Sequence, residues 1–353
     1  MTRSFAAAVV AAMACTACAG SNHTPTQETP SLDSVVSSET GFSGHILVVE
    51  GDEIVFDHVS GEAEPGRAMT QSEHWRWASV TKQLVAVAIM DAVDDGALRL
   101  DSTVSEILPD LAGPDTGAVQ IKHLLQHTSG LLNPYGLSQE DLALQMSFGL
   151  SPAALCLQTA TSPAGAEFSY NNCDFIVLGA VLEAVDGGTW LESLSVRVFE
   201  PAAMTDVYFN SPDQVETVAD PAPTSAVAPI AQYGAAGGLY GTPQSLVAFN
   251  SALLDGRLLS DEARAALWDG NPKLGFVALG QWSFSAPLAG CSETVAIVER
   301  RGEIGGIQAR NILLPEVDLS VIVFTNSPGL DFGEIWMGQG FAHDLLSAAA
   351  CTN

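Results

Sequence analysis

The stretch Trp77-Ala78-Ser79-Val80-Thr81-Lys82-Gln83 opens a long apolar segment of the chain. Apolar residues recur in it at helical spacing and stop before Gly96, so we predict a buried helix over 79–92. Residues three apart share one face of a helix, which brings the Ser79 hydroxyl and the Lys82 amine together. A serine is a weak nucleophile until a base removes its proton, and a lysine with a lowered pKa can be that base. The stretch therefore predicts a nucleophile at the start of a core helix.

Strand and helix patterns lie on both sides of this segment. Residues 44–50 and 53–60 alternate apolar and polar side chains around Gly51-Asp52, which predicts two strands joined by a tight turn. Further strands are predicted over 276–284, 294–300, 307–314 and 319–325. Further helices are predicted over 119–127, 152–160, 172–185, 190–199, 243–254, 261–268 and about 332–349.

The order of these elements predicts an α+β fold. Two segments of the chain, about 41–105 and 230–353, are predicted to form an antiparallel sheet flanked by helices. A mostly helical region, about 106–229, is inserted between the two parts. The predicted domain as a whole spans 41–353.

A second polar motif, Tyr170-Asn171-Asn172, opens another apolar helix about ninety residues after Ser79. A tyrosine near a lysine can carry a proton to a leaving group, and an amide can orient the lysine or the substrate. The pattern recurs at Tyr208-Phe209-Asn210, but that copy follows Glu200-Pro201 in what we predict to be an exposed connection, so Tyr170 is preferred. The alternative for Tyr170 is a packing tyrosine beside an asparagine that only caps a helix.

Six blocks of residues, in order along the chain, match the motifs of one family. The chain resembles the serine beta-lactamase-related hydrolases of the class C type. That family includes class C beta-lactamases, D-alanyl-D-alanine carboxypeptidases, D-aminopeptidases and S-x-x-K esterases. The blocks are the nucleophile segment 77–83, the HLLTHTSGL-like 121–131, the FxYSN-like 168–172, the FEPLGMTDT-like 199–206, the AGGLYST-like 237–242, and 313–326, which is similar to the last strand pair.

The resemblance implies catalysis through an acyl-enzyme. Ser79 would attack a carbonyl group, while Lys82 with Tyr170 takes and returns the proton and Asn172 orients the site. The backbone N–H groups of Ser79 and Glu303 are the implied oxyanion hole. Catalysis of this kind needs no metal, and we expect none.

The third family motif, K-T-G or H-x-G on an edge strand, is replaced here by Arg300-Arg301-Gly302. Arginine keeps a positive charge and offers a fork for a carboxylate, but it cannot exchange a proton at neutral pH. Arg300 and Gly302 are therefore predicted to bind substrate without shuttling protons. The alternative is that Arg300 only pairs with nearby acidic side chains.

We predict from these residues an exported serine hydrolase that cleaves small carboxylic esters or amides. A D-alanyl-D-alanine carboxypeptidase or a beta-lactamase ranks second, because loss of the K-T-G lysine disfavours efficient lactam hydrolysis. A third hypothesis, from another class, is a catalytically silent protein that binds penicillin or peptidoglycan. The expected partner is a small ester, peptide or lactam substrate.

Other motifs argue against other chemistries. His123 and His127 lie four apart, but no glutamate stands between them as in H-E-x-x-H, so we predict a structural role rather than a metal site. The G-x-S-x-G elbow, G-x-G-x-x-G and P-loop motifs are absent from the sequence, and we expect no nucleotide cofactor.

The charge balance restricts the partners. The chain has 41 acidic and 13 basic residues and a net charge of −28, while its apolar share of 47% is that of a folded protein. Binding to nucleic acid or to anionic lipid depends on clustered cations, so we predict no nucleic-acid partner. Solubility in a salty medium is a sufficient reason for the acidity.

The N-terminus has the features of an export signal over residues 1–18: one positive charge, a short apolar run and small residues. The segment around Cys18 resembles a bacterial lipobox, with Cys18 the preferred lipidation site and Cys15 the second choice. The alternative is cleavage near Ala19 without a lipid. Residues 19–40 are predicted to be a flexible tether. We therefore expect a periplasmic or outer-membrane-anchored lipoprotein.

Four cysteines remain beyond the predicted signal, which permits two disulfides in an exported chain. The pairing of nearest neighbours in sequence is Cys156–Cys173 with Cys291–Cys351. Two other pairings, or four buried thiols, are the alternatives.

Overall fold

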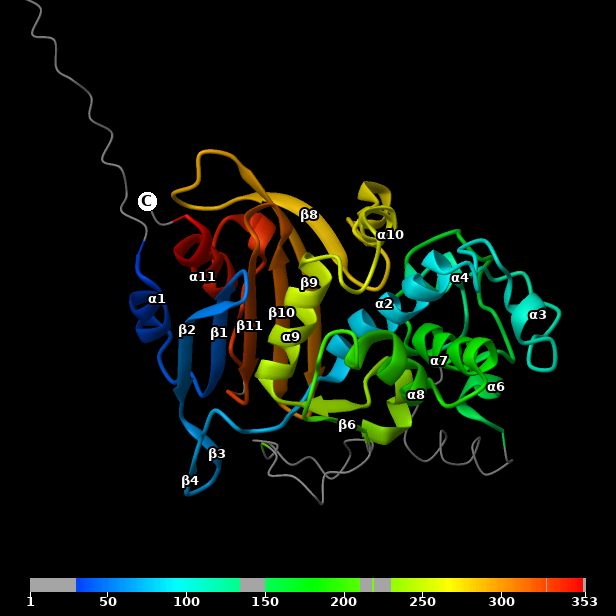
Figure 1. The fold of residues 1–353 in the computed structure, drawn as a ribbon, viewed down its shortest axis with the longest axis horizontal. Coiled ribbons are helices and arrows are strands. Elements are labelled where there is room, and N and C mark those ends of the chain that lie inside the picture. The colour runs from blue at the N-terminus through cyan, green and yellow to red at the C-terminus, as the bar shows by residue number, and fades with distance from the viewer. Residues whose placement is uncertain (1–29, 134–149, 210–217, 219–229, 328, 352–353) are drawn as a thin grey trace, which may run out of the picture.

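The centre of the fold is a six-stranded antiparallel sheet in the order β2-β1-β11-β10-β9-β8 (Figure 1). The computed structural model describes residues 30–133, 150–209, 218, 230–327 and 329–351. Strands from both ends of the chain pair in this sheet, so the predicted α+β architecture is confirmed. The strands are β1 (Gly44–Glu50), β2 (Glu53–Ser60), β8 (Trp282–Pro287), β9 (Thr294–Ile304), β10 (Ile307–Leu314) and β11 (Leu319–Thr325).

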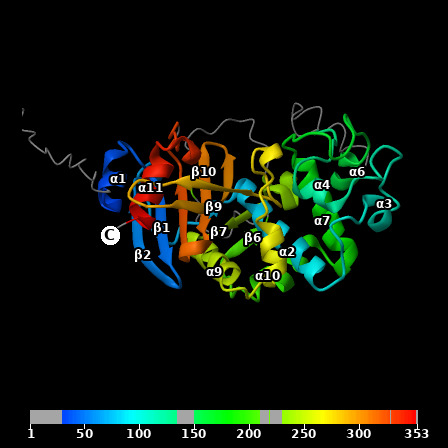
Figure 2. The same ribbon diagram turned by 90° about the horizontal axis from the view of Figure 1, so that it is seen from above.

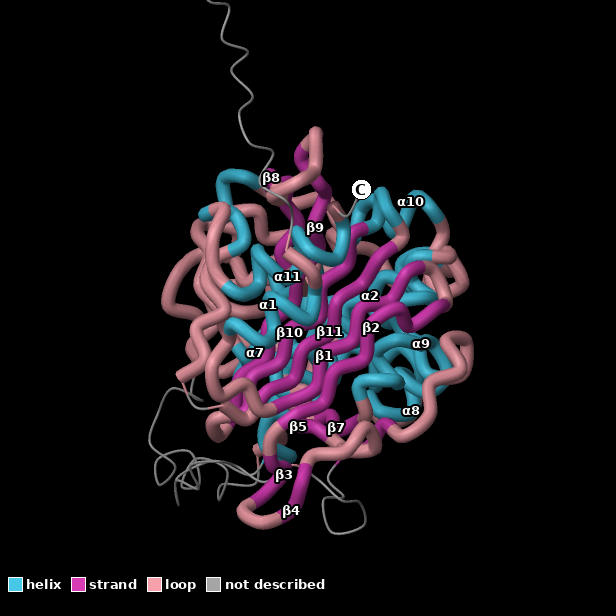
Figure 3. Tube along the Cα trace, turned by 90° about the vertical axis from the view of Figure 1, so that its left-hand side faces the viewer, coloured by secondary structure: helices cyan, strands magenta, loops and turns pink. Residues whose placement is uncertain are grey.

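Each face of the sheet has its own apolar core, because side chains alternate along every strand. Ile46 and Val48 of β1 pack toward α1 and α11, whereas Leu47 belongs to the core shared with α2 and α9. Figures 1 and 3 show α1 and α11 on one side of the sheet and α9 on the other. The helices are α1 (Leu32–Ser38), α2 (Thr81–Asp94), α9 (Pro243–Leu254), α10 (Asp261–Leu267) and α11 (Phe341–Ala350).

Helix α1 corrects part of the flexible tether predicted over 19–40. Ser31 caps this helix by accepting a hydrogen bond from the Ser34 N–H, and Val35 and Val36 are buried in the same core as α11. Two adjacent valines are enough to dock this stretch, although its Ser- and Pro-rich composition favours an extended chain. The predicted signal segment, Cys18 and the first part of the tether lie outside the described residues.

The strand predicted over 276–284 begins later, as β8 at Trp282. The residues before it turn back on themselves through isolated bridges from Val277 to Asn271 and from Val277 to Trp282. The apolar residues there belong to a packed loop, in which Val277, Ala278 and Leu279 are all buried.

The last helix was predicted to begin near residue 332 and begins at Phe341. Gly333, Gly338 and Gly340 all have positive φ, so the chain makes loops there and only one 3-10 turn, η8 (Ile335–Met337). Glycine is the residue that adopts this backbone region without strain.

The inserted region lies at one end of the molecule in Figures 1 and 2, with α2 between it and the sheet. Two helices there are shorter than predicted: 121–125 in place of 119–127, and 152–156 in place of 152–160. The helix predicted over 190–199 ends at residue 194 and is followed by a π-helical turn, η3 (Ser195–Phe199). None of the described helices is long and apolar enough to cross a bilayer. The elements are α3 (Val104–Ile107), α4 (Ile121–Leu125), α6 (Pro152–Cys156), α7 (Asn172–Asp186) and α8 (Trp190–Leu194).

Small strands join the inserted region to the rest of the chain. β7 (Leu239–Gly241) pairs with β5 (Trp75–Arg76) on one side and with β6 (Val207–Phe209) on the other. The turn η5 (Ile230–Ala236) comes directly before β7. A separate hairpin of β3 (Glu62–Glu64) and β4 (Arg67–Ala68) follows β2.

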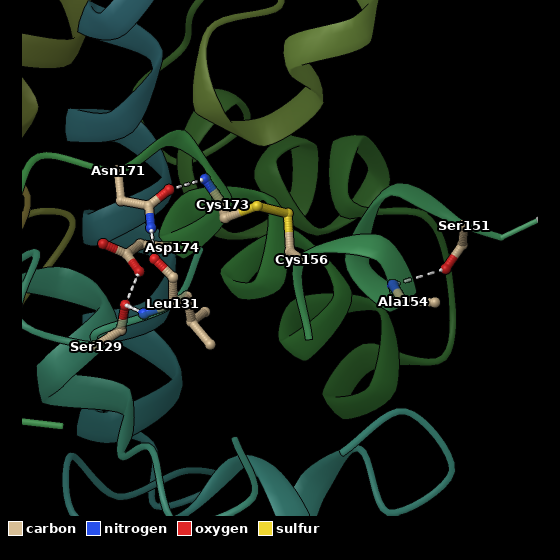
Figure 4. The surroundings of a disulfide bond; sticks show 8 residues. All are labelled: Ser129, Leu131, Ser151, Ala154, Cys156, Asn171, Cys173 and Asp174. Carbon is tan, nitrogen blue, oxygen red and sulfur yellow. Dashed lines mark hydrogen bonds between the residues drawn. A yellow bond between two sulfur atoms is a disulfide. The ribbon is translucent and has the colours of Figure 1, made fainter. Parts of the chain in front are cut away.

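Two disulfides have the pairing of nearest neighbours in sequence. Cys156–Cys173 links α6 to the first turn of α7 (Figure 4). Cys291–Cys351 links the connection between β8 and β9 to the end of α11. The predicted pairing is therefore confirmed, and the alternative of four free thiols is wrong.

Candidate active site

Ser79 lies in a tight turn that leads into α2. The turn is η1 (Ala78–Val80), and Ala78 has a φ of 47°, in the left-handed region that favours glycine. The buried indole of Trp77 anchors the turn by donating from Nε1 to the carbonyl oxygen of Gly241 at 3.1 Å. A strained backbone of this kind often marks a functional site. Here it presents Ser79 to a cavity of about 430 Å³.

The cavity brings together the residues that the sequence predicts for the site. They come from the start of α2, the start of α7 and the end of β9, which are far apart in the chain. The predicted residues that line it are Ser79, Tyr170, Asn172, Arg300, Gly302 and Glu303. Lys82 is fully buried beneath Ser79.

The hydroxyl of Ser79 contacts both of its predicted proton carriers. Its Oγ lies 2.6 Å from the hydroxyl oxygen of Tyr170 and accepts a hydrogen bond from Nζ of Lys82 at 3.0 Å. Because Lys82 donates to Oγ, the proton of the serine is free to point at Tyr170. This geometry lets Tyr170 receive the serine proton directly.

Lys82 uses its three N–H donors on three different acceptors. Besides Ser79, Nζ donates to Oδ1 of Asn172 at 2.9 Å and to the backbone carbonyl of Ala236 at 2.6 Å. Asn172 is the first residue of α7, and the side chain of Asn171 caps that helix by accepting from the Cys173 N–H. The fold therefore fixes the ammonium group from three sides.

The electrostatics make Tyr170 the better base of the pair. Burial is the main cause that lowers the pKa of Lys82 to about 8, and the charge of Arg300 lowers it further. Burial alone would raise the pKa of Tyr170, but the positive charges of Lys82 and Arg300 outweigh it and lower that pKa to about 7. Near neutral pH the pair holds a phenolate beside an ammonium.

Arg300 points into the site rather than toward the acidic surface. Its side chain is buried, with Nε donating to the carbonyl oxygen of Ser79 at 2.9 Å and Nη2 donating to the hydroxyl oxygen of Tyr170 at 3.1 Å. Its guanidinium also lies 5.3 Å from the ring of Trp282. Over the described ranges no carboxylate pairs with Arg300, so the alternative of a surface ion pair is wrong.

The neighbouring cations, Arg301 and Arg310, are neutralised by two acids, of which Glu299 contacts both. Glu299 is fully buried and pairs with Arg301 at 2.9 Å and with Arg310 at 2.6 Å. Arg301 also pairs with the partly exposed Glu334 at 2.7 Å. Glu299 and Arg301 therefore belong to an ion-pair network, whereas Arg300 between them directs its side chain to the cavity.

Gly302 allows β9 to approach the nucleophile turn. A β-carbon at this position would collide with the backbone carbonyl of Trp77 and would lie 3.3 Å from the backbone nitrogen of Ser79. Any other residue at 302 would push the strand away from Ser79. The next residue, Glu303, lines the same cavity. That the N–H groups of Ser79 and Glu303 form the oxyanion hole stays a prediction.

The structure separates the motif at Tyr208 from the site. The hydroxyl of Tyr208 contacts the Asp206 carboxylate at 3.3 Å, and the residue lies in β6, away from the cavity lining. The two histidines have different partners: Nδ1 of His123 accepts from the Gln120 N–H at 3.2 Å, and Nδ1 of His127 lies 2.9 Å from Oδ2 of Asp174. Within the described residues no group of histidine, cysteine and carboxylate side chains could hold a metal ion.

Three parts of the site escaped sequence reasoning. Ala236 contributes only its carbonyl oxygen, which leaves no signal in a residue type. Tyr233 of η5 and Trp282 at the start of β8 also line the cavity, and neither belongs to one of the motifs used above. His127 was assigned a structural role, yet its ring centroid lies 4.6 Å from that of Tyr170. Its signal was present in the family-like block 121–131.

Comparison with known proteins places this geometry in a family. The model of the family described as Beta-lactamase matches residues 32–339. The chain is 33% identical over 182 residues to esterase EstB of Burkholderia gladioli, covering 47% of this chain and 46% of the esterase. It is 27% identical over 179 residues to a D-aminopeptidase of Cereibacter sphaeroides, covering 49% of this chain and 34% of that protein. The matches thus span less than half of either relative's length.

Solved structures show the same fold. A penicillin-binding protein from Bacillus halodurans superimposes with a TM-score of 0.70 at 23% sequence identity, covering 90% of this chain and 97% of that one. At this identity the likeness concerns the fold alone. Because the family model matches most of this chain, residues 32–339, the chain belongs to the beta-lactamase family of serine hydrolases.

Proposed function

We propose that the protein is a hydrolase that forms an acyl-enzyme on Ser79 and cleaves small carboxylic esters or amides. The observation that carries this proposal is the hydroxyl of Ser79 held between Tyr170 at 2.6 Å and Lys82 at 3.0 Å. A nucleophile, a base and a group that orients the base are the elements of covalent catalysis. The similarity to an esterase and to a D-aminopeptidase supports both ester and amide substrates.

The first half of the reaction forms the acyl-enzyme. As Oγ of Ser79 bonds to the carbonyl carbon, its proton passes to the phenolate oxygen of Tyr170, and the carbonyl oxygen becomes an oxyanion. Backbone N–H groups at Ser79 and Glu303 are the proposed donors to that oxyanion. The intermediate then collapses: the bond to the leaving group breaks, and Tyr170 returns the proton to the departing alkoxide or amine.

The second half releases the acid. A water molecule gives a proton to the Tyr170 phenolate while the water oxygen attacks the acyl carbon. The bond from that carbon to Oγ then breaks as Tyr170 passes the proton to Oγ of Ser79, which regenerates the phenolate. Lys82 remains protonated throughout and stabilises the phenolate form of Tyr170 through charge and through its bond to Ser79. Asn172 holds Lys82 in place.

Arg300 favours substrates without a carboxylate near the scissile bond. Two of its donors are used by Ser79 and Tyr170, and it is only 1% exposed. Arg301 and Arg310 are neutralised by Glu299 and Glu334. Of the arginines in the described cavity lining, only the buried Arg300 lacks a carboxylate partner, and it reaches an anionic substrate only through the donors that Ser79 and Tyr170 leave unused. This ranks neutral esters and amides above beta-lactams, which carry a carboxylate.

Ser79→Ala tests the mechanism. It should abolish turnover of a small activated ester. The unmutated enzyme treated with a fluorophosphonate should lose fluoride from the reagent and gain the mass of the phosphonyl group on the Ser79 peptide. Unchanged activity in Ser79→Ala would refute the proposal. A silent binding protein would show no turnover in a panel of neutral esters, D-alanyl-D-alanine peptides and a chromogenic cephalosporin, and that panel also ranks the substrate classes.

We propose in addition that the protein is exported and lipidated at Cys18. Support comes from the signal-like residues 1–18 and from two disulfides, which form in oxidising compartments. Mass spectrometry of the N-terminal peptide from the membrane fraction decides this: a lipid on Cys18 supports the anchor, and an unmodified N-terminus near Ala19 contradicts it.

A further inference from the structure

His127 lies directly behind Tyr170 and takes no part in the proposed proton transfers. Its side chain is 2% exposed, and its φ of 55° falls in the left-handed region that non-glycine residues rarely adopt. Its ring is 4.6 Å from the ring of Tyr170 and 5.3 Å from that of Phe175. A buried histidine in a strained backbone next to a base is a candidate for a role in the site.

The contacts of His127 hold the chain on both sides of Tyr170. The N–H of Ser169 donates to the carbonyl oxygen of His127 at 2.8 Å, and the N–H of Asn171 donates to its Nδ1 at 3.3 Å. The backbone N–H groups of the residues before and after Tyr170 thus both donate to His127. A third bond, from Nδ2 of Asn171 to the carbonyl of Leu131 at 2.7 Å, fixes the same segment to the loop after His127.

The protons of this cluster can be placed from its donors. Nδ1 of His127 accepts from a backbone N–H, so it carries no proton itself. It lies 2.9 Å from Oδ2 of Asp174, and a contact of that length needs a proton on the carboxyl group. The other oxygen, Oδ1, accepts from Oγ of Ser129. With Nδ1 accepting, the arrangement makes Asp174 a neutral acid that donates to a neutral imidazole, whose proton is then on Nε2, a buried atom without a hydrogen-bond partner among the described residues.

The surroundings favour this neutral pair. Burial raises the pKa of the fully buried Asp174 well above its ordinary value. Burial also lowers the pKa of His127 well below its ordinary value, and the charges of Arg300 and Lys82 act in the same direction. A third cation next to Lys82 and Arg300 is thus avoided. The two titratable groups behind Tyr170 add no charge to the site.

We propose that His127 is a positioning residue for Tyr170. Held by the neutral Asp174, its imidazole and its carbonyl clamp the backbone on either side of Tyr170. This clamp fixes the phenol oxygen where Ser79 and Arg300 both donate to it. The inference rests on the proposed function in one respect, namely that Tyr170 is the base.

Two substitutions at position 127 separate the acceptor from the backbone. His127→Gly accepts the left-handed backbone without strain but removes Nδ1 and the ring. His127→Asn also tolerates this backbone and places a carbonyl oxygen close to the position of Nδ1. We expect kcat on a neutral ester to fall about 100-fold in His127→Gly, with a much smaller change in KM, because a small misplacement of a catalytic group has this effect. In His127→Asn we expect most of the wild-type kcat to be retained.

The ionisation of Tyr170 gives a readout that does not depend on turnover. The absorbance of its phenolate is obtained by recording the ultraviolet spectrum of each protein and subtracting the spectrum of the same protein that also carries Tyr170→Phe. In the wild type the phenolate should appear near pH 7, the pKa of Tyr170 being about 7. In His127→Gly the midpoint should move upward, toward the ordinary 10.0, since the displaced oxygen loses its donors. An unmoved midpoint together with wild-type kcat would overturn the proposal, as would equal losses of kcat in the Gly and Asn variants.

The protonation of His127 is tested on the wild type alone. A long-range proton–nitrogen NMR spectrum, assigned by comparison with His127→Asn, should show Nε2 protonated and Nδ1 bare. A proton on Nδ1, or on both nitrogens, would contradict the clamp even if the Gly variant failed to fold. Activity of Ser79→Ala is the separate control: wild-type turnover there would refute the acyl-enzyme, while the absorbance and NMR results would still decide the role of His127.

Discussion

Arg300 donates a hydrogen bond from Nη2 to the hydroxyl oxygen of Tyr170 at 3.1 Å, and its Nε binds the carbonyl of Ser79. One guanidinium therefore contacts both the base and the residue that carries the nucleophile. A family lysine or histidine at this place could shuttle a proton, whereas an arginine supplies only a permanent positive charge. Its effect should thus be visible in the pH dependence of the reaction.

Replacing Arg300 should shift the acid limb of the pH profile. In Arg300→Gln the loss of a positive charge raises the pKa of Tyr170 above its wild-type value of about 7. Because the phenolate is the active form, the acid limb of kcat/KM should move to higher pH by about one unit. Arg300→Lys keeps the charge and is the matched control, with a smaller shift. The measurement is kcat/KM for a neutral ester against pH, and an unmoved limb in Arg300→Gln would contradict the role of the charge.

The wild-type profile should be bell-shaped with a narrow maximum. Activity rises as Tyr170 loses its proton, with a pKa of about 7, and falls as Lys82 loses its proton, with a pKa of about 8. Tyr170→Phe should lower kcat by about 10²- to 10⁴-fold, the usual contribution of a general base. Initial rates over a series of buffers at constant ionic strength test this. A profile that is flat across neutral pH would show that another group is the base.

Stability should rise with pH between about 7 and 10. The folded-state pKa values of Tyr170, about 7, and Lys82, about 8, both lie below their ordinary values of 10.0 and 10.5. In this window the unfolded chain binds more protons than the folded one, so raising the pH favours folding. The melting temperature should increase by at least about 2 °C over the window. The double variant Lys82→Met, Tyr170→Phe should lack this increase, and an equal increase in both proteins would point to other groups.

The two disulfides should differ in their effect on activity. Replacing Cys156 and Cys173 by serine removes a bond next to Asn172, so we expect loss of both stability, about 3 kcal/mol, and kcat. Neither Cys291 nor Cys351 lines the cavity, so replacing both by serine should cost about 4 kcal/mol of stability with kcat unchanged. Denaturant unfolding and ester turnover of the two double variants measure both effects. Equal kcat values in the two double variants would show that the Cys156–Cys173 bond does not affect catalysis.

Local spacing explains why much of the site was predictable. Ser79 and Lys82 meet because they lie three apart on one helix, and Tyr170 and Asn172 flank a helix start, so short motifs describe both pairs. The strands 307–314 and 319–325 were predicted with their observed bounds. The second is a nearly continuous apolar run, as in a strand buried on both faces, and the first alternates at its start and ends in three apolar residues.

The orientation of side chains in the assembled fold was not predictable in this way. The sequence places Arg300 at the family's cation position, but only the packing of β9 against the nucleophile turn decides that its donors reach Ser79 and Tyr170. The role of His127 depends likewise on contacts with residues more than forty positions away. The short helix α1 was missed because its two buried valines have no amphipathic pattern beyond one turn.

The disulfide from Cys156 to Cys173 adjoins, along the backbone, the amide that holds Lys82. Oxidation of these two thiols thus completes the support of the first turn of α7, and with it the position of Asn172. A newly made chain that is still reduced has its serine, lysine and tyrosine but lacks this last constraint. We therefore expect oxidation of these two thiols to bring the active site to its final arrangement, so that full activity develops where the thiols can be oxidised.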